Sequence, residues 1–165
     1  MNLFIDYFTS EERSRKIYRD AIALIKPIDL HFSVDNRDDF FDVINRRDLT
    51  SINHITILTH GVNNSEYICK DGQLINAISY LELVHSLNST INGIDVKLNL
   101  VGICESFEIK PFVRYLNTRF SEIWISKVKN PSLSAPIIMV YEGFDYLIYD
   151  KDEEDIIYEK ILNPL

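Results

Sequence analysis

The chain has 165 residues, of which 46% are hydrophobic and 25% are charged, and its formal net charge is −8. This size and composition are typical of one globular domain with a sizeable apolar core, so we expect a single domain over residues 1–165. The acidic charge opposes binding to the phosphates of nucleic acids and to anionic membranes, and we expect neither as a partner.

The first third of the chain predicts strands that alternate with helices. Thr9 and Glu12 have the spacing of a capping box, and the helix that they begin must end before Pro27. A run rich in β-branched residues ends at Thr59 and predicts a buried strand. In chain order, the predicted elements are a strand over 2–6, the helix after Thr9, a strand over 29–34, a helix over 37–47 and a strand over 52–59.

The rest of the chain continues this alternation. Asp71 and Gly72 predict the turn of a small hairpin, Ser79 and Glu82 form a second capping-box pattern, and Ser106 is placed to cap a later helix. The predicted elements that follow the hairpin are a helix from Ser79, a strand over 95–103, a helix from Ser106, a strand over 122–126, a loop over 127–136, an apolar run over 137–149 that fits a strand or a helix, and a closing helix over 152–162.

Such alternation predicts an α/β fold, a three-layer sandwich with a mostly parallel central sheet. The strands over 52–59 and 95–103 are the most uniformly apolar, which places them near the centre of the sheet. Sites in such sheets form outside the carboxyl ends of the strands. Because His60 and Cys104 follow these two strands, we expect them to lie close together at one edge of the sheet.

These two residues have the chemistry of a thiol-dependent hydrolase. A thiolate is an effective nucleophile, and an imidazole can activate it and protonate a leaving group. The backbone N–H groups of Gly61 and Cys104 are candidate donors to an oxyanion, and the helix start after Cys104 is expected to lower the thiol pKa. Taken singly, each residue is more often structural: a histidine at a strand end is usually a rim residue, and a cysteine in an apolar run is usually part of the core.

Cysteine and histidine usage gives no sign of a disulfide scaffold or a metal site. Cys69 and Cys104 are too few for a secreted disulfide framework, and the four histidines lack metal-ligand spacing, so we expect no metal. No apolar run reaches the roughly 18 residues of a membrane-spanning helix. The N-terminal apolar segment is interrupted by Asp6 and is unlike a signal peptide, so we expect a cytoplasmic protein.

The segments ITILTHG and LNLVGICES resemble motifs of the caspase-like cysteine peptidases of clan CD, and most closely those of the bacterial CHAT branch. That branch has an apolar strand that ends in His-Gly, and a later strand that ends in a cysteine followed by an acidic and a small residue. The corresponding residues here are His60-Gly61 and Cys104-Glu105-Ser106. The similarity extends over about residues 37–126.

This resemblance implies a cysteine endopeptidase that needs no cofactor. Cys104 would be the nucleophile, His60 the general acid and base, and the N–H groups of Gly61 and Cys104 the oxyanion donors. It also implies a protein or peptide substrate, a regulatory or sensor protein as a further partner, and a role in bacterial defence or regulated toxicity. Ile103 stands where many members of the family have a small residue, which narrows the approach to the cysteine.

A non-catalytic interaction module remains an alternative. The segment LFIDYFTSEERSRKIYRDAIALI is similar to the opening of TIR and receiver-type domains. A receiver would need an aspartate after the third strand, where His60 stands instead, and a TIR-type NAD hydrolase would need a catalytic glutamate, for which Glu82 and Glu105 are the candidates. An inactive peptidase scaffold that binds a protein partner would keep both His60 and Cys104.

Overall fold

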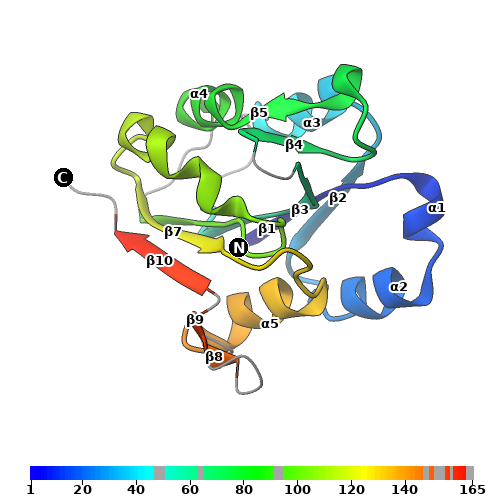
Figure 1. Ribbon diagram of the computed structural model, residues 1–165. Helices are drawn as coiled ribbons and strands as arrows, with labels where there is room; N and C mark the ends of the chain where they lie inside the picture. Colours follow the sequence, from blue (N-terminus) through cyan, green and yellow to red (C-terminus); the bar gives the residue numbers. More distant parts are fainter. Residues whose placement is uncertain are drawn as a thin grey trace.

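A mostly parallel sheet forms the middle layer of the computed structural model, which describes residues 1–46, 51–62, 65–90, 95–146, 149–150, 155–156 and 158–162 (Figure 1). The strands lie side by side in the order β10 (Tyr158–Leu162), β7 (Phe120–Ser126), β6 (Val96–Asn99), β3 (His54–Gly61), β1 (Asn2–Tyr7) and β2 (Leu30–Val34). All neighbouring pairs in this order are parallel except β10 and β7, which are antiparallel.

A small antiparallel extension continues the sheet beyond the end of β3. The strand β4 (Tyr67–Cys69) pairs with the last residues of β3, and β5 (Ile78–Ser79) pairs with β4. This is the hairpin predicted around Asp71 and Gly72, and it carries a short 3₁₀ helix, η1 (Leu74–Asn76), between its strands. Two further short strands, β8 (Tyr149–Asp150) and β9 (Asp155–Ile156), pair only with each other within the described residues.

Helices cover both faces of the sheet and complete the three layers, which confirms the predicted fold class. One face carries α3 (Arg37–Ile44), α4 (Tyr80–Thr90) and the long 3₁₀ helix η2 (Ser106–Tyr115), and the other carries α2 (Lys16–Ile22) and α5 (Ser134–Glu142) (Figure 1). A one-turn helix, α1 (Ser10–Arg13), precedes α2. None of the helices in the described part of the chain is long and apolar enough to cross a membrane.

Side-chain alternation along the strands divides the core between the two faces. Successive side chains of a strand point to opposite faces of its sheet. In β1, Leu3 and Ile5 pack with α3 and α4, whereas Phe4 packs with α2 and α5. In β3, Ile57 belongs to the first core and Leu58 to the second. Both faces of the central strands are therefore buried, which explains their almost continuous apolar sequence.

The predicted helix over 152–162 is wrong in its described part. Residues 158–162 form β10, with Lys160 opposite Trp124 of β7. Tyr158 is buried among the side chains of one core and Ile161 packs against the other, so the two apolar residues face opposite sides of the sheet. Two apolar residues that are three positions apart also lie on the same face of a helix, so the sequence pattern of Tyr158 and Ile161 fits a helix as well as this strand. Residues 151–154 and 157 lie outside the described part of the chain.

Two other predicted elements also differ from the structure. The ambiguous run over 137–149 contains most of α5, which begins at Ser134 within the predicted loop over 127–136 and ends before Gly143. The single helix predicted after Thr9 is divided into α1 and α2, because Arg15 has an extended backbone with φ −72° and ψ 146°. The capping box at Ser79 is confirmed, because the N–H of Glu82 donates to Ser79 Oγ and the N–H of Ser79 donates to Glu82 Oε1. At Thr9 the N-cap is confirmed by the N–H of Glu12, which donates to Thr9 Oγ1, while the Glu12 carboxylate accepts the Thr9 hydroxyl.

His54 begins β3 in an environment that disfavours its protonated form. Its ring meets the ring of Trp124 edge-on, with 5.2 Å between the centroids, and its Nδ1 is buried without a hydrogen-bond partner among the described residues. Burial, and next to it the nearby Lys97 ammonium, lower the pKa of His54 from its ordinary 6.5 to about 4. Folding therefore favours the neutral imidazole.

We predict that His54 makes the protein less stable in mild acid. Between about pH 6.5 and about pH 4 the unfolded chain binds a proton at His54 that the folded chain does not, so the free energy of unfolding falls as the pH falls. The His54→Phe variant, which keeps an aromatic ring beside Trp124, should lose less stability over this interval. The exposed His85 offers a matched control, His85→Phe. Chemical denaturation at several pH values measures the effect, and equal pH dependence of the wild type and His54→Phe would contradict it.

Candidate active site

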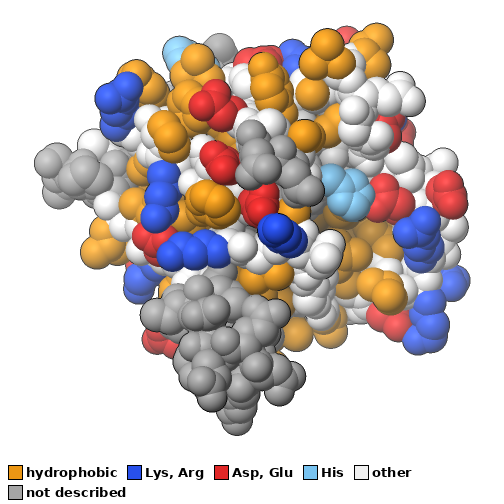
Figure 2. Space-filling view, viewed as in Figure 1, with side chains coloured by type: hydrophobic (Ala, Val, Ile, Leu, Met, Phe, Trp, Pro, Cys, Tyr) orange, Lys and Arg blue, Asp and Glu red, His pale blue; other side chains and the backbone are white. Residues whose placement is uncertain are grey.

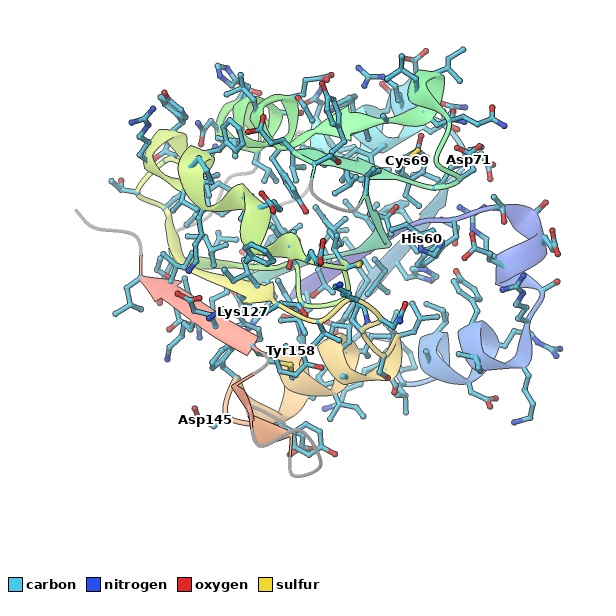
Figure 3. The ribbon with its side chains drawn as sticks, viewed as in Figure 1. His60, Cys69, Asp71, Lys127, Asp145 and Tyr158 are labelled. Carbon is cyan, nitrogen blue, oxygen red and sulfur yellow. The ribbon has the colours of Figure 1, made fainter. Side chains whose placement is uncertain are left out.

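His60 lies near the end of β3, where the buried part of the strand gives way to solvent. About half of its side chain is exposed (52%), whereas Thr59 directly before it is buried. The imidazole meets the Phe8 ring edge-on at 5.2 Å between centroids, and its Nε2 lies 2.6 Å from Oε2 of Glu12 on α1. Figure 3 shows His60 between α1 and the β4 hairpin. The ring is thus accessible to solvent and yet held by two neighbours.

Cys104 lies in a loop between β6 and η2 and not directly at the end of a strand. β6 ends at Asn99, so residues 100–103, which were predicted as strand, belong to this loop. The buried Asn99 side chain explains the early end: its Oδ1 accepts the N–H of Val101, and its amide donates to the carbonyl of Pro136 on α5. The bond from Val101 takes the place of a ladder bond, while the N–H of Leu100 still donates to the carbonyl of Trp124 in β7.

Gly61 brings the end of β3 into backbone contact with this loop. A Cβ atom at Gly61 would overlap the carbonyl oxygen of Cys104 and would lie 3.0 Å from its carbonyl carbon. Only glycine allows the two backbones to approach so closely, which accounts for the glycine that follows His60. The N–H of Val62 donates to Tyr67 of β4, and hydrogen bonds alternate along an antiparallel ladder, so the N–H of Gly61 points away from β4.

His60 and Cys104 are both among the residues that line one cavity of about 170 Å³. Phe8 and Glu12 form one of its sides, and the segment from Lys129 to Leu133 forms another. The predicted nucleophile and the predicted base therefore reach the same small space from β3 and from the loop after β6. In the described part of the chain, no group of three His, Cys, Asp or Glu side chains is arranged to hold a metal ion.

The electrostatic environment of Cys104 favours the neutral thiol. Burial, and after it the negative charge of Glu105, raise the pKa of Cys104 above its ordinary value, while the Lys129 ammonium acts in the opposite direction. The expectation of a lowered thiol pKa is therefore wrong. The helix after Cys104 is a 3₁₀ helix that contains Pro111, and it starts after Glu105 in a left-handed conformation with φ 51°. A base that removes the thiol proton is therefore needed for reaction.

Ser106 has a different role from the predicted helix cap. Its Oγ is buried and accepts the N–H of Ser126 at 2.8 Å, at the carboxyl end of β7. The N–H of Glu105 donates to the carbonyl of Val128, just beyond the same strand. These two bonds hold the residues that follow Cys104 against β7, so the Cys104 segment is fixed from the β7 side as well as by Gly61.

The second cysteine lies next to the site, which the sequence did not predict. Cys69 of β4 is paired with His60 in the β3–β4 register, and the labelled positions of the two residues can be followed in Figure 3. Its Sγ is buried, 3.3 Å from the carbonyl oxygen of Gln73 and 3.5 Å from Oδ1 of Asp71. Cys69 lines a neighbouring hollow of about 390 Å³, which also contacts His60 and Glu12. Cys104 is not among the residues that line this second hollow.

Sequence reasoning missed Glu12 and Lys129 as parts of the site. The sequence assigns Glu12 only a helix-capping role, and it places Lys129 in the loop over 127–136 without singling it out. The parallel pairing of β1 with β3 brings the segment after β1 beside His60, and the pairing of β6 with β7 brings the segment after β7 beside Cys104. Knowledge of the strand order would have indicated that Glu12 and Lys129 lie at the site. The strand order cannot be read from local sequence patterns, so both residues were missed.

We predict that Gly61→Ala destabilises the protein by about 2–3 kcal/mol, because the added methyl group forces the end of β3 away from Cys104. The same change should alter the rate at which iodoacetamide alkylates Cys104. The control is Gly72→Ala, whose new Cβ would meet no atom within 4 Å but would sit at a φ of 77°, so its cost comes from the backbone alone. Wild-type stability and alkylation in Gly61→Ala would contradict the close contact.

We predict that Lys129→Met raises the pH at which alkylation of Cys104 reaches half of its maximal rate. Removal of the ammonium leaves burial and Glu105 as the main influences on the thiol, and both raise its pKa. The Cys69→Ala background isolates the signal of Cys104, and Lys127→Met is the matched control because Lys127 pairs with Glu159. Mass spectrometry over a series of pH values gives the midpoint. Equal midpoints for Lys129→Met and its control would show that Lys129 does not act on the thiol.

Comparison with known proteins gives no family for this chain: no protein-family model matches it, and no curated protein matches its sequence significantly. The chemistry of the site is therefore argued from its own residues, and the similarity of its two motifs to those of caspase-like peptidases stays a prediction.

Proposed function

We propose that the protein is a cysteine endopeptidase in which Cys104 attacks the peptide carbonyl and His60 transfers the protons. The observation that supports this most is the cavity of about 170 Å³ that Cys104 and His60 line together. The contact between Gly61 and the Cys104 backbone adds to it, because it holds the two segments in one arrangement. The resemblance of the same two segments to the CHAT branch of caspase-like peptidases implies the same reaction.

The proposed reaction begins when His60 accepts the proton of the Cys104 thiol. The thiolate sulfur then forms a bond to the carbonyl carbon of the substrate, and the carbonyl π electrons move to the oxygen, which the backbone N–H groups of Gly61 and Cys104 would stabilise. The imidazolium gives its proton to the departing amine as the C–N bond breaks. Water attacks the resulting thioester with His60 as base, and the carboxylic acid product leaves as the thiol is restored.

The raised thiol pKa gives His60 an essential task in this reaction. Because Cys104 is held mainly as the neutral thiol, little thiolate is available before a substrate arrives. A low resting thiolate fraction also limits alkylation and oxidation, both of which require the thiolate. The site is therefore suited to an enzyme whose thiolate forms only after a substrate has bound beside Cys104 and His60.

The surface around the site is compatible with a polypeptide substrate. In Figure 2, basic and acidic side chains are interspersed with hydrophobic ones over the face that is shown. A hollow of about 120 Å³, lined by Phe8, Ile17, Tyr18 and Leu133 together with the charged Glu12 and Arg15, shares Phe8, Glu12 and Leu133 with the cavity of Cys104. The proposal extends to a cytoplasmic enzyme with a regulatory or sensor protein as partner, acting in bacterial defence or regulated toxicity.

A non-catalytic α/β interaction module is the second candidate function. One observation favours it: Leu74 and Ile75 of η1 are 84% and 77% exposed, side by side on the hairpin that follows β3. Apolar side chains exposed in this way occur at surfaces that bind proteins. Such a module would bind a partner through this hairpin and would not need the thiol of Cys104.

We predict that Cys104→Ala and His60→Ala each reduce peptide cleavage by about 10³-fold or more, because either change removes a group that acts in every turnover. The control is Cys69→Ala, which removes the neighbouring thiol and should retain activity. Cleavage of a denatured protein substrate, followed by mass spectrometry, measures the activity, and thermal unfolding checks the fold of each variant. Full activity of Cys104→Ala would reject the peptidase.

The same samples separate the peptidase from the alternatives. Incubation with NAD, followed by proton NMR, should leave NAD intact, whereas its hydrolysis would favour a TIR-type enzyme. A wild-type protein that cleaves no peptide and no NAD, but binds a partner that Leu74→Ser and Ile75→Ser variants lose, would favour the interaction module.

A further inference from the structure

The short helix α1 is fixed to the sheet although none of its side chains is buried. Its Arg13 crosses to β1, where Nε lies 2.9 Å from Oδ1 of Asp6. The same guanidinium donates to the carbonyl of Val34 and to Oδ1 of Asp35, beyond the end of β2. The planar guanidinium of Arg13 thus binds groups on β1 and at the end of β2. These bonds fix both the position and the orientation of α1.

The anchor of this helix is a buried carboxylate. Asp6 is fully buried, and its Oδ2 is bonded to the hydroxyl groups of Tyr18 and Ser33, at 2.7 Å and 2.6 Å, and to Nε2 of His31 at 2.5 Å. Burial acts to raise the pKa of Asp6, but the hydrogen bonds from His31, Ser33 and Tyr18 outweigh it, so the pKa is lowered. Asp6 therefore stays ionised and gives Arg13 a constant partner.

The residue before Arg13 places its carboxylate on the candidate base. Oε2 of Glu12 lies 2.6 Å from Nε2 of His60, and Oε1 accepts the hydroxyl of Thr9 at 3.3 Å. The backbone N–H of Glu12 donates to Thr9 Oγ1, also at 3.3 Å, so the backbone and the side chain are both held. Glu12 is 24% exposed, which is half the exposed fraction of His60.

We propose that Glu12 is a positioning residue for His60 and forms a Cys-His-Glu arrangement with it and Cys104. The carboxylate accepts the proton on Nε2 of His60, so the neutral ring has its free lone pair on Nδ1 and can accept the thiol proton there. When it has done so, the negative charge of Glu12 stabilises the imidazolium. This inference rests on the proposed peptidase function, and Glu12, His60 and Cys104 all line the cavity of about 170 Å³.

The contacts around Glu12 distinguish it from an ordinary surface ion pair. Exposed ion pairs contribute little because both side chains move freely and are screened by water. Here both oxygens of the carboxylate have partners, the helix is anchored through Arg13 to the buried Asp6, and the imidazole is held from another side by Phe8. The neighbouring Glu11 shows the contrast, since its side chain is 84% exposed and its partner Arg15 lies 3.6 Å away.

We predict that Glu12→Gln lowers kcat about 10- to 100-fold while KM stays within about two-fold, because the imidazole loses the charge that orients and stabilises it. The matched control is Glu11→Gln on the same turn, which should retain wild-type kcat. Glu12→Asp keeps the charge but withdraws it from the ring, so its kcat should lie between those of the wild type and Glu12→Gln. Full kcat in Glu12→Gln would overturn the inference.

A second readout tests Glu12 without any turnover. The ¹⁵N chemical shifts of the His60 ring report which nitrogen carries the proton in the neutral form. The wild type should show the Nε2–H tautomer, and Glu12→Gln should show a larger share of the Nδ1–H tautomer, whereas Glu11→Gln should not. An unchanged tautomer in Glu12→Gln would overturn the positioning role even if kcat fell. If the wild type cleaves no peptide, the proposed function fails, but this measurement still decides whether Glu12 orients His60.

Discussion

The arrangement of the site depends on the backbone contact between Gly61 and Cys104. β3 pairs with β6 only as far as Thr56 and Asn99, so the last residues of β3 extend beyond the end of β6. The chain after Asn99 turns and lies against this extension, and the absence of a side chain at Gly61 lets the two backbones meet. A parallel pair of strands alone would bring the two segments to the same edge of the sheet. The glycine contact sets where along that edge the thiol lies.

Around this contact, the thiol of Cys104 and the imidazole of His60 lie in different electrostatic environments. The thiol of Cys104 is partly buried, beside the negative charge of Glu105, and is favoured in its neutral form. The imidazole of His60 is half exposed and meets a carboxylate. In the proposed reaction a proton would pass from a group that is costly to ionise to one that already has a carboxylate partner, and such a division of environments is common at catalytic sites. The Lys129 ammonium opposes the effect of Glu105 on the pKa of the thiol but does not outweigh it.

The parts of the fold that depend on local sequence were predicted well. The β-branched run that ends at Thr59 and the N-caps Thr9 and Ser79 need only neighbouring residues, and the structure confirms them. The early end of β6 could not be predicted, because Asn99 binds a residue of α5 that lies far along the chain. β10 was misread as a helix because Tyr158 and Ile161, three residues apart, serve opposite faces of the sheet. The site was likewise predicted only for residues at strand ends. Glu12 comes from a segment whose position depends on the strand order, and Cys69 comes from β4, whose antiparallel pairing with the end of β3 was not predicted.

The measurement that would test the site most directly is a crystal structure of the protein after reaction with a short peptide aldehyde, which forms a hemithioacetal with a catalytic thiol. We expect the aldehyde carbon to be bonded to Sγ of Cys104, with a ring nitrogen of His60 within about 3–4 Å of that sulfur or of the hemithioacetal oxygen. An adduct on Cys69, or an adduct on Cys104 with the His60 ring turned out of the cavity, would contradict the proposed pairing of thiol and imidazole.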